Sequence, residues 1–101
     1  MKSVDVYLAL GSNIKPELHM ARALEMLTEH IPILRLSMFY WTPALHRPDN
    51  PAFLNGACLA STTAPPEALK WEVLRPIEKT LGRTRTGINP YGPRPIDIDI
   101  V

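Results

Sequence analysis

The chain has 101 residues, of which 46% are apolar and 21% charged, and its formal net charge is +1. This is ordinary globular composition at the length of one compact domain, so it disfavours a coiled coil, a disordered chain or two domains, and we expect a single domain over residues 1–101. The near-neutral charge also excludes the overall basicity that is typical of sequence-independent nucleic-acid binding.

The apolar stretches of the chain do not suit a membrane. Asp5 interrupts the N-terminal apolar run, which is too short for a secretory signal, and the uncharged run from Pro51 to Pro66 contains further prolines. Cys58 is the one cysteine, so no intrachain disulfide forms and a reducing compartment fits. We therefore expect a cytoplasmic protein with neither a membrane nor a nucleic-acid partner.

The first half of the chain predicts a strand followed by a helix. Residues 4–10 are rich in β-formers and are closed by Gly11-Ser12-Asn13, which favour a turn. Pro16 suits the first turn of a helix, and Ile31-Pro32 ends the pattern. Apolar residues recur between them at helical spacing: Leu18, Ala21, Leu24 and Leu27.

Two further strands are predicted over residues 34–41 and 53–62. Residues 42–52, which connect them, contain three prolines and cannot form a tight hairpin. A connection of this length in a small domain is more often functional than accidental.

The remaining residues predict a second helix and a last strand. The helix opens at Pro65-Pro66, ends at Gly82 and contains Pro76, where we expect a kink or a break. Its apolar stripe is Leu69, Val73, Ile77 and Leu81. Residues 83–95 are a loop, and residues 96–101 form the final strand.

The element order β-α-β-β-α-β predicts an α+β fold of the ferredoxin-like kind, with a four-stranded antiparallel sheet and both helices on one face. Strands 4–10 and 53–62 carry apolar residues on both sides. The second face therefore calls for a cover, either a partner subunit or chain absent here, and self-association through this face is consistent with its apolar content.

The final strand alternates isoleucine with aspartate, which places Asp97 and Asp99 on one face, about 7 Å apart along the strand. Two carboxylates on one face suit a divalent cation, and they equally suit a solvated strand face. The preceding segment is cationic, with Arg75, Lys79, Arg83, Arg85 and Arg94 against the single acid Glu78. Such a segment suits the phosphates of a magnesium-bound nucleotide, and the alternative is that its arginines pair with the two aspartates themselves.

The run Gly92-Pro93-Arg94-Pro95-Ile96-Asp97-Ile98-Asp99-Ile100, preceded by Glu78 and by Gly82-Arg83-Thr84-Arg85, resembles the signature of the 6-hydroxymethyl-7,8-dihydropterin pyrophosphokinase family. Two other stretches match in the same order: Leu8-Ala9-Leu10-Gly11-Ser12-Asn13, and Thr42-Pro43-Ala44-Leu45 followed by Phe53-Leu54-Asn55. Members of this family continue well past the last strand of this chain, in a portion that supplies further adenine and phosphate contacts and a second aromatic against the pterin.

The resemblance implies transfer of diphosphate from ATP to 6-hydroxymethyl-7,8-dihydropterin, a step of folate biosynthesis, with release of AMP. It implies that Asp97 and Asp99 hold two Mg²⁺ ions and that Arg83 and Arg94 contact the phosphates and support the transition state. Arg85 is implied as a helper, and Arg75 and Glu78 are implied on the nucleotide side.

The same resemblance places the pterin against residues of the long connection and of the strand after it. Thr42, Pro43 and Leu45 would contact the ring, Phe53 would stack on it, and the amide of Asn55 would bond its polar edge. Tyr91 would help to close the site. Asn55 in an apolar strand is also hard to explain as a core residue, because a buried amide without a partner costs about 1–3 kcal/mol.

Two alternatives stand beside a complete enzyme. One is a catalytically incomplete relative that binds pterin and nucleotide and needs a partner or a missing C-terminal segment. The other is an RNA-recognition domain, which shares the element order, although the strand over residues 53–62 lacks the closely spaced aromatics that stack on bases.

Overall fold

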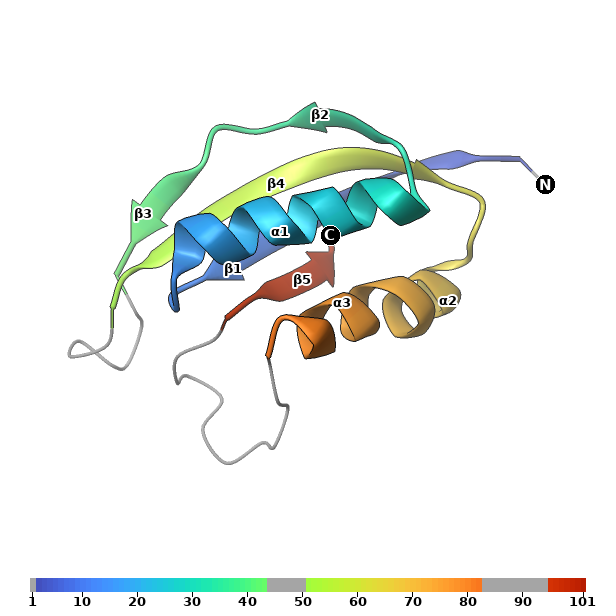
Figure 1. Ribbon diagram of the computed structural model, residues 1–101. Coiled ribbons are helices and arrows are strands. Elements are labelled where there is room, and N and C mark those ends of the chain that lie inside the picture. The colour runs from blue at the N-terminus through green and yellow to red at the C-terminus, as the bar shows by residue number, and fades with distance from the viewer. Residues whose placement is uncertain (1, 44–50, 83–94) are drawn as a thin grey trace.

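The computed structural model describes residues 2–43, 51–82 and 95–101 (Figure 1). The strands are β1 Val4–Ser12, β2 Ile33–Leu36, β3 Tyr40–Thr42, β4 Phe53–Thr62 and β5 Asp97–Ile100. The helical segments are α1 Pro16–His30, α2 Pro66–Leu69, the π-helical turn η1 Lys70–Leu74 and α3 Arg75–Thr80. Across the described ranges no helix is long and apolar enough to cross a membrane.

All five strands join one antiparallel sheet in the order β2-β4-β1-β5, and β3 also pairs with β4. The helices lie on one face of this sheet (Figure 1). The predicted α+β, ferredoxin-like arrangement is therefore confirmed, with one strand more than expected.

Alternation along the central strands separates a helix-facing side from an outer side. In β4 every second residue is buried, beginning with Leu54, and Leu8 and Leu10 of β1 are buried on the same side. The core is completed by residues of the helices and the last strand: Met20, Ala23, Leu27, Leu69, Leu74, Ile77, Ile96 and Ile98. The alternate residues, including Asp97 and Asp99, consequently belong to the outer side.

The helix α1 has the predicted bounds but buries a different stripe. Leu18 is 52% exposed and Ala21 is exposed, whereas Met20, Ala23 and Leu27 are buried. The expected stripe was therefore wrong at Leu18 and Ala21, while Leu27 is buried and Leu24 packs against the core. The buried set has its own three- and four-residue spacing, so periodicity alone could not separate the two.

The single strand expected over residues 34–41 is divided into β2 and β3. Leu36 lies opposite Cys58 and Tyr40 opposite Asn55, so four steps along one side match three steps along β4. Ser37 still lies opposite Ala57, because its N–H donates to the Ala57 carbonyl at 2.8 Å and its hydroxyl accepts from the Ala57 N–H at 2.8 Å. The extra residue therefore falls between Ser37 and Tyr40. A one-residue excess of this kind is a β-bulge, which bends the strand and ends its regular pairing.

The predicted disturbance of the second helix takes the form of the π-helical turn η1. The N–H of Arg75 reaches back five residues to the Lys70 carbonyl, immediately before Pro76. This turn shifts the buried stripe, so Leu74 and Glu78 are buried while Val73 and Leu81 of the expected stripe are half-buried. The helix ends as predicted before Gly82, whose φ is +100°.

Candidate functional site

Asn55, Gly11 and Asp97 lie in one row on the outer side of the sheet. Gly11 of β1 is opposite Asn55 of β4 and also opposite Asp97 of β5. Directly opposed residues face the same side, and neighbouring strands are about 4.8 Å apart, so the backbones of Asn55 and Asp97 are about 10 Å apart. In the next row Ala9 lies opposite Asp99. An amide and two acids therefore face one side across a floor of small residues.

Gly11 is needed for the shape of this floor. A Cβ at this position would lie 3.0 Å from Oδ1 of Asn55 and 3.8 Å from Cδ1 of Phe53. Any side chain would consequently press on the amide, whereas glycine leaves the surface between Asn55 and Asp97 flat. From the sequence, Gly11 is expected only in a turn and in a matching stretch. Its position opposite an asparagine and an aspartate depends on the strand register.

Asn55 is held by the neighbouring strand. Its Nδ2 donates a hydrogen bond to the Thr42 hydroxyl at 2.6 Å, and Thr42 is itself paired with Phe53. Asn55 is half-buried rather than fully buried, and Pro43, next to Thr42, is exposed. The structure therefore brings together four of the residues expected at the pterin: Thr42, Pro43, Phe53 and Asn55.

The two acids differ in their surroundings. Asp97 is half-buried, whereas the Asp99 side chain is 53% exposed and its Oδ1 lies 3.4 Å from Nη2 of Arg75. The second reading of the acid strand, pairing with an arginine, therefore holds for Asp99 in part, and the carboxylate still reaches solvent.

The acid strand fits magnesium by its chemistry. Among the residues that the structure describes, no group of three or more His, Cys, Asp or Glu side chains could hold a metal. Mg²⁺ usually takes one or two carboxylates and completes its shell with water and substrate phosphate, so Asp97 and Asp99 are a sufficient protein contribution.

Arg75 and Glu78 meet the backbone of β5. Glu78 is 2% exposed, and its Oε2 accepts a hydrogen bond from the Ile98 N–H at 2.8 Å. Nη1 of Arg75 donates to Oε1 of Glu78 at 2.9 Å and to the Ile98 carbonyl at 3.0 Å. Both residues are expected near the nucleotide from the sequence. Their connection to β5 was not predicted, because it depends on the shift in helix phase that η1 introduces.

A further contact joins the end of β1 to the start of β4. Asn13 is buried, and its Nδ2 donates to the Pro51 carbonyl at 3.3 Å. This bond holds the two strands together beside Gly11 and Phe53. The expected turn at Gly11-Ser12-Asn13 was placed too early, because β1 continues through Ser12.

Five residues named in the sequence analysis lie outside the described residues: Leu45, Arg83, Arg85, Tyr91 and Arg94. Their assigned roles stay predictions.

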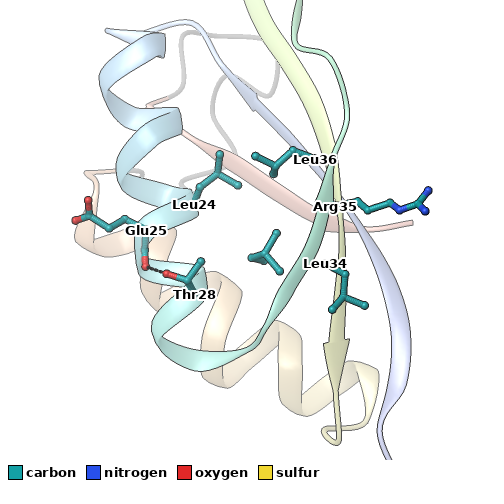
Figure 2. Close-up of a pocket in the computed structure, with 7 residues that line it drawn as sticks. Leu24, Glu25, Thr28, Leu34, Arg35 and Leu36 are labelled. Atoms are coloured by element: carbon teal, nitrogen blue, oxygen red, sulfur yellow. Dashed lines mark hydrogen bonds between the residues drawn. The ribbon is translucent and has the colours of Figure 1, made fainter.

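An apolar groove of about 450 Å³ lies elsewhere, between α1 and β2 (Figure 2). Leu24 and Leu36 point toward each other across it, and Arg35 points away. Thr28 at its border donates its hydroxyl proton to the Glu25 carbonyl at 2.6 Å. This groove is lined by residues of α1 and β2 and contains none of the outer-face residues Asn55, Asp97 and Asp99.

The fold and the outer-face residues define a ferredoxin-like α+β domain with a polar site on the open side of its sheet. A family model described as 7,8-dihydro-6-hydroxymethylpterin-pyrophosphokinase matches residues 7–101. The chain belongs to this family, which confirms the resemblance and removes the RNA-recognition alternative.

Similar proteins carry corresponding names. The chain is 43% identical to the mitochondrial folate synthesis bifunctional protein of Pisum sativum, over 96% of this chain and 19% of the relative. It is 39% identical to the 2-amino-4-hydroxy-6-hydroxymethyldihydropteridine pyrophosphokinase of Pseudomonas aeruginosa, over 95% of this chain and 59% of the relative. The corresponding protein of Aquifex aeolicus is 35% identical, with 95% and 59% covered. The chain thus spans about a fifth of the bifunctional relative and under two thirds of the two pyrophosphokinases.

Proposed function

We propose that this chain carries the substrate floor of a pyrophosphokinase that transfers diphosphate from ATP to 6-hydroxymethyl-7,8-dihydropterin in folate biosynthesis. A bond forms between the hydroxymethyl oxygen and the β-phosphorus, and the bond from that phosphorus to the α,β-bridging oxygen breaks. AMP leaves with the bridging oxygen, and the hydroxyl proton is released. The family membership and the names of the relatives support this reaction.

The observation that carries the proposal is the row Asn55, Gly11 and Asp97. It puts a group that can bond the edge of a flat heterocycle about 10 Å from a carboxylate, on one open surface. Diphosphate transfer depends on positioning and charge stabilisation more than on a strong base, and such a surface supplies positioning for both substrates.

At the pterin end, Asn55 would bond the polar edge of the ring while Thr42 keeps its amide oriented. Phe53 would stack on the ring, with Pro43 and Leu45 beside it and Tyr91 closing the site. Each of these contacts excludes water from the acceptor hydroxymethyl group and fixes its direction.

At the nucleotide end, Asp97 and Asp99 would hold Mg²⁺, with two ions expected alongside ATP. Bound magnesium neutralises charge on the phosphates and orients them. Arg83 and Arg94 would bind the phosphates in the transition state, with Arg85 assisting and with Arg75 and Glu78 on the same side.

The second candidate function is binding of pterin and nucleotide without turnover. Its support is that the chain spans 59% of the length of each of the two pyrophosphokinases. In that case the remaining contacts to adenine and pterin would come from a partner or from further chain. Binding of both substrates without release of AMP is the outcome that this candidate predicts.

The test incubates the chain with MgATP and 6-hydroxymethyl-7,8-dihydropterin and measures AMP by chromatography. Asp97→Asn removes one carboxylate charge and is expected to reduce AMP release about a hundredfold or more. Asp5→Asn is the matched control, because Asp5 is exposed on the outer side at the far end of β1, opposite Ser61. Equal AMP release by Asp97→Asn and the unaltered chain would refute the proposed site.

A further inference from the structure

The strand that carries both acids lies at the edge of the sheet. Within the described ranges β5 pairs with β1 alone, and Leu10 is opposite Ile98. The Val101 N–H donates to the Tyr7 carbonyl at 2.9 Å, and hydrogen-bonded pairs alternate along an antiparallel ladder. Counting back from that pair, the N–H and the carbonyl of Ile98 point away from β1.

Both of these backbone groups are bonded by side chains of α3. Oε2 of Glu78 accepts from the Ile98 N–H at 2.8 Å, and Nη1 of Arg75 donates to the Ile98 carbonyl at 3.0 Å. Arg75 and Glu78 thus give Ile98 the donor and the acceptor that a neighbouring strand would otherwise supply.

The buried ion pair of Arg75 and Glu78 contributes little net stability for its desolvation cost. Glu78 is 2% exposed and the Arg75 side chain 14%, and removing two charges from water carries a desolvation cost that their attraction only partly offsets. The second guanidinium nitrogen of Arg75 extends to Asp99, at 3.4 Å from Oδ1. The pair therefore contacts the acid strand through its backbone and through one of the proposed magnesium ligands.

We propose that Arg75 and Glu78 are positioning residues: they hold β5 at Ile98 so that Asp97 and Asp99 present their carboxylates to the outer face at a fixed spacing. This inference rests on the proposed function, because it assigns to the pair an effect on magnesium-bound nucleotide. It gives Arg75 and Glu78 an action through β5 that does not require either of them to touch the nucleotide.

The experiment compares the full chain with three variants: Glu78→Gln, Arg75→Lys and the control Glu72→Gln. Glutamine keeps the shape of Glu78 but has one acceptor oxygen in place of two, so it cannot accept from both the Ile98 N–H and Arg75. Lysine cannot fork between the Ile98 carbonyl and Asp99. Glu72 is exposed on η1, so its exchange makes the same change of charge away from β5. Thermal unfolding of each variant identifies any that fails to fold.

Two quantities are measured on each chain. Hydrogen exchange followed by NMR gives the protection of the Ile98 amide, and calorimetry gives the Mg²⁺ dependence of binding of α,β-methylene-ATP, an analogue whose scissile linkage is replaced by a CH₂ group. We expect Glu78→Gln to lower the protection and to raise the Mg²⁺ concentration for half-saturation about tenfold or more. Arg75→Lys should fall between Glu78→Gln and the unaltered chain, and Glu72→Gln should match the unaltered chain.

Unchanged protection of the Ile98 amide in Glu78→Gln would overturn the inference. Lost protection with an unchanged Mg²⁺ dependence would overturn it as well. In both cases, binding of the analogue by the unaltered chain leaves the proposed function standing. If the unaltered chain binds no magnesium-bound analogue, the proposed function itself fails and takes the positioning role with it. The two failures are distinguished by that one measurement on the unaltered chain.

Discussion

Asn55 and Thr42 are joined by a side-chain hydrogen bond of 2.6 Å, which crosses from β4 to β3 on the outer face. The short strand β3 follows a bulge and pairs with β4 through its three residues, and this side-chain bond adds two things. It fixes the plane of the Asn55 amide, and it keeps the start of the connection after Thr42 beside the proposed pterin surface.

The substitution Thr42→Val tests this relationship, because valine keeps the volume of threonine and removes the acceptor. We expect the free energy of unfolding to fall by about 1 kcal/mol, since Asn55 is half-buried and water replaces part of the lost bond. Pterin affinity, measured by fluorescence titration, should fall as well because the amide is no longer oriented. Thr63→Val, at an exposed position after β4, is the control for the change in urea denaturation. Identical results for the two variants would contradict an anchoring role for Thr42.

The substitution Gly11→Ala tests the flat floor. The new Cβ would lie 3.0 Å from Oδ1 of Asn55, so the amide must move and pterin binding should weaken. A double-mutant cycle with Asn55→Ala separates this mechanism from a general disturbance of β1. If the methyl group acts through the amide, adding Gly11→Ala to Asn55→Ala should change pterin affinity little. Additive losses of affinity in the double mutant would show that Gly11 acts by another route.

Much of this fold follows from local patterns in the chain. Proline at position 16, the isoleucine–aspartate alternation of the last strand and the run over residues 53–62 each predicted an element that the structure contains. These signals are local because helix starts and strand faces depend on nearest neighbours and on a period of two.

The parts that escaped prediction depend on pairing between distant segments. The bulge between Ser37 and Tyr40 is set by a mismatch of one residue against β4, and the burial of Glu78 follows from the phase of η1. The place of Gly11 between Asn55 and Asp97 required the register of three strands. The residue types therefore predicted which residues belong to the site. Their arrangement in space depends on strand register and helix phase.

The Cys58 thiol is predicted to be unreactive in the folded chain. It is buried on the helix-facing side, and burial raises its pKa. Less thiolate is then present at a given pH, and the thiolate is the species that reacts. The same shift stabilises the folded chain fully below the pKa of the unfolded thiol, and this contribution is lost as the pH rises toward the folded value.

Labelling with iodoacetamide at pH 8, followed by mass spectrometry, measures this reactivity. We expect labelling of the native chain to be slower by about tenfold or more than labelling in urea, where the single cysteine should take one label. Equal rates with and without urea would show that β4 opens readily to solvent.

The substitution Gly56→Ala is predicted to affect stability and to leave the outer face unchanged. Gly56 follows Asn55 in β4 but faces the helices, and a Cβ there would lie 2.6 Å from the ring carbons Cδ2 and Cε2 of Phe39. Overpacking of this kind costs about 1–3 kcal/mol, measured by urea denaturation. Phe39→Leu in the same chain should restore part of the loss, because a smaller side chain makes room for the methyl group.

Nucleotide and pterin affinities of Gly56→Ala, measured on the folded fraction, should stay within about twofold of those of the unaltered chain. The outer and helix-facing sides of one sheet respond separately when they share no contact. A loss of binding as large as that of Gly11→Ala, without a change in the free energy of unfolding, would mean that the two faces of β4 are exchanged relative to the arrangement described here.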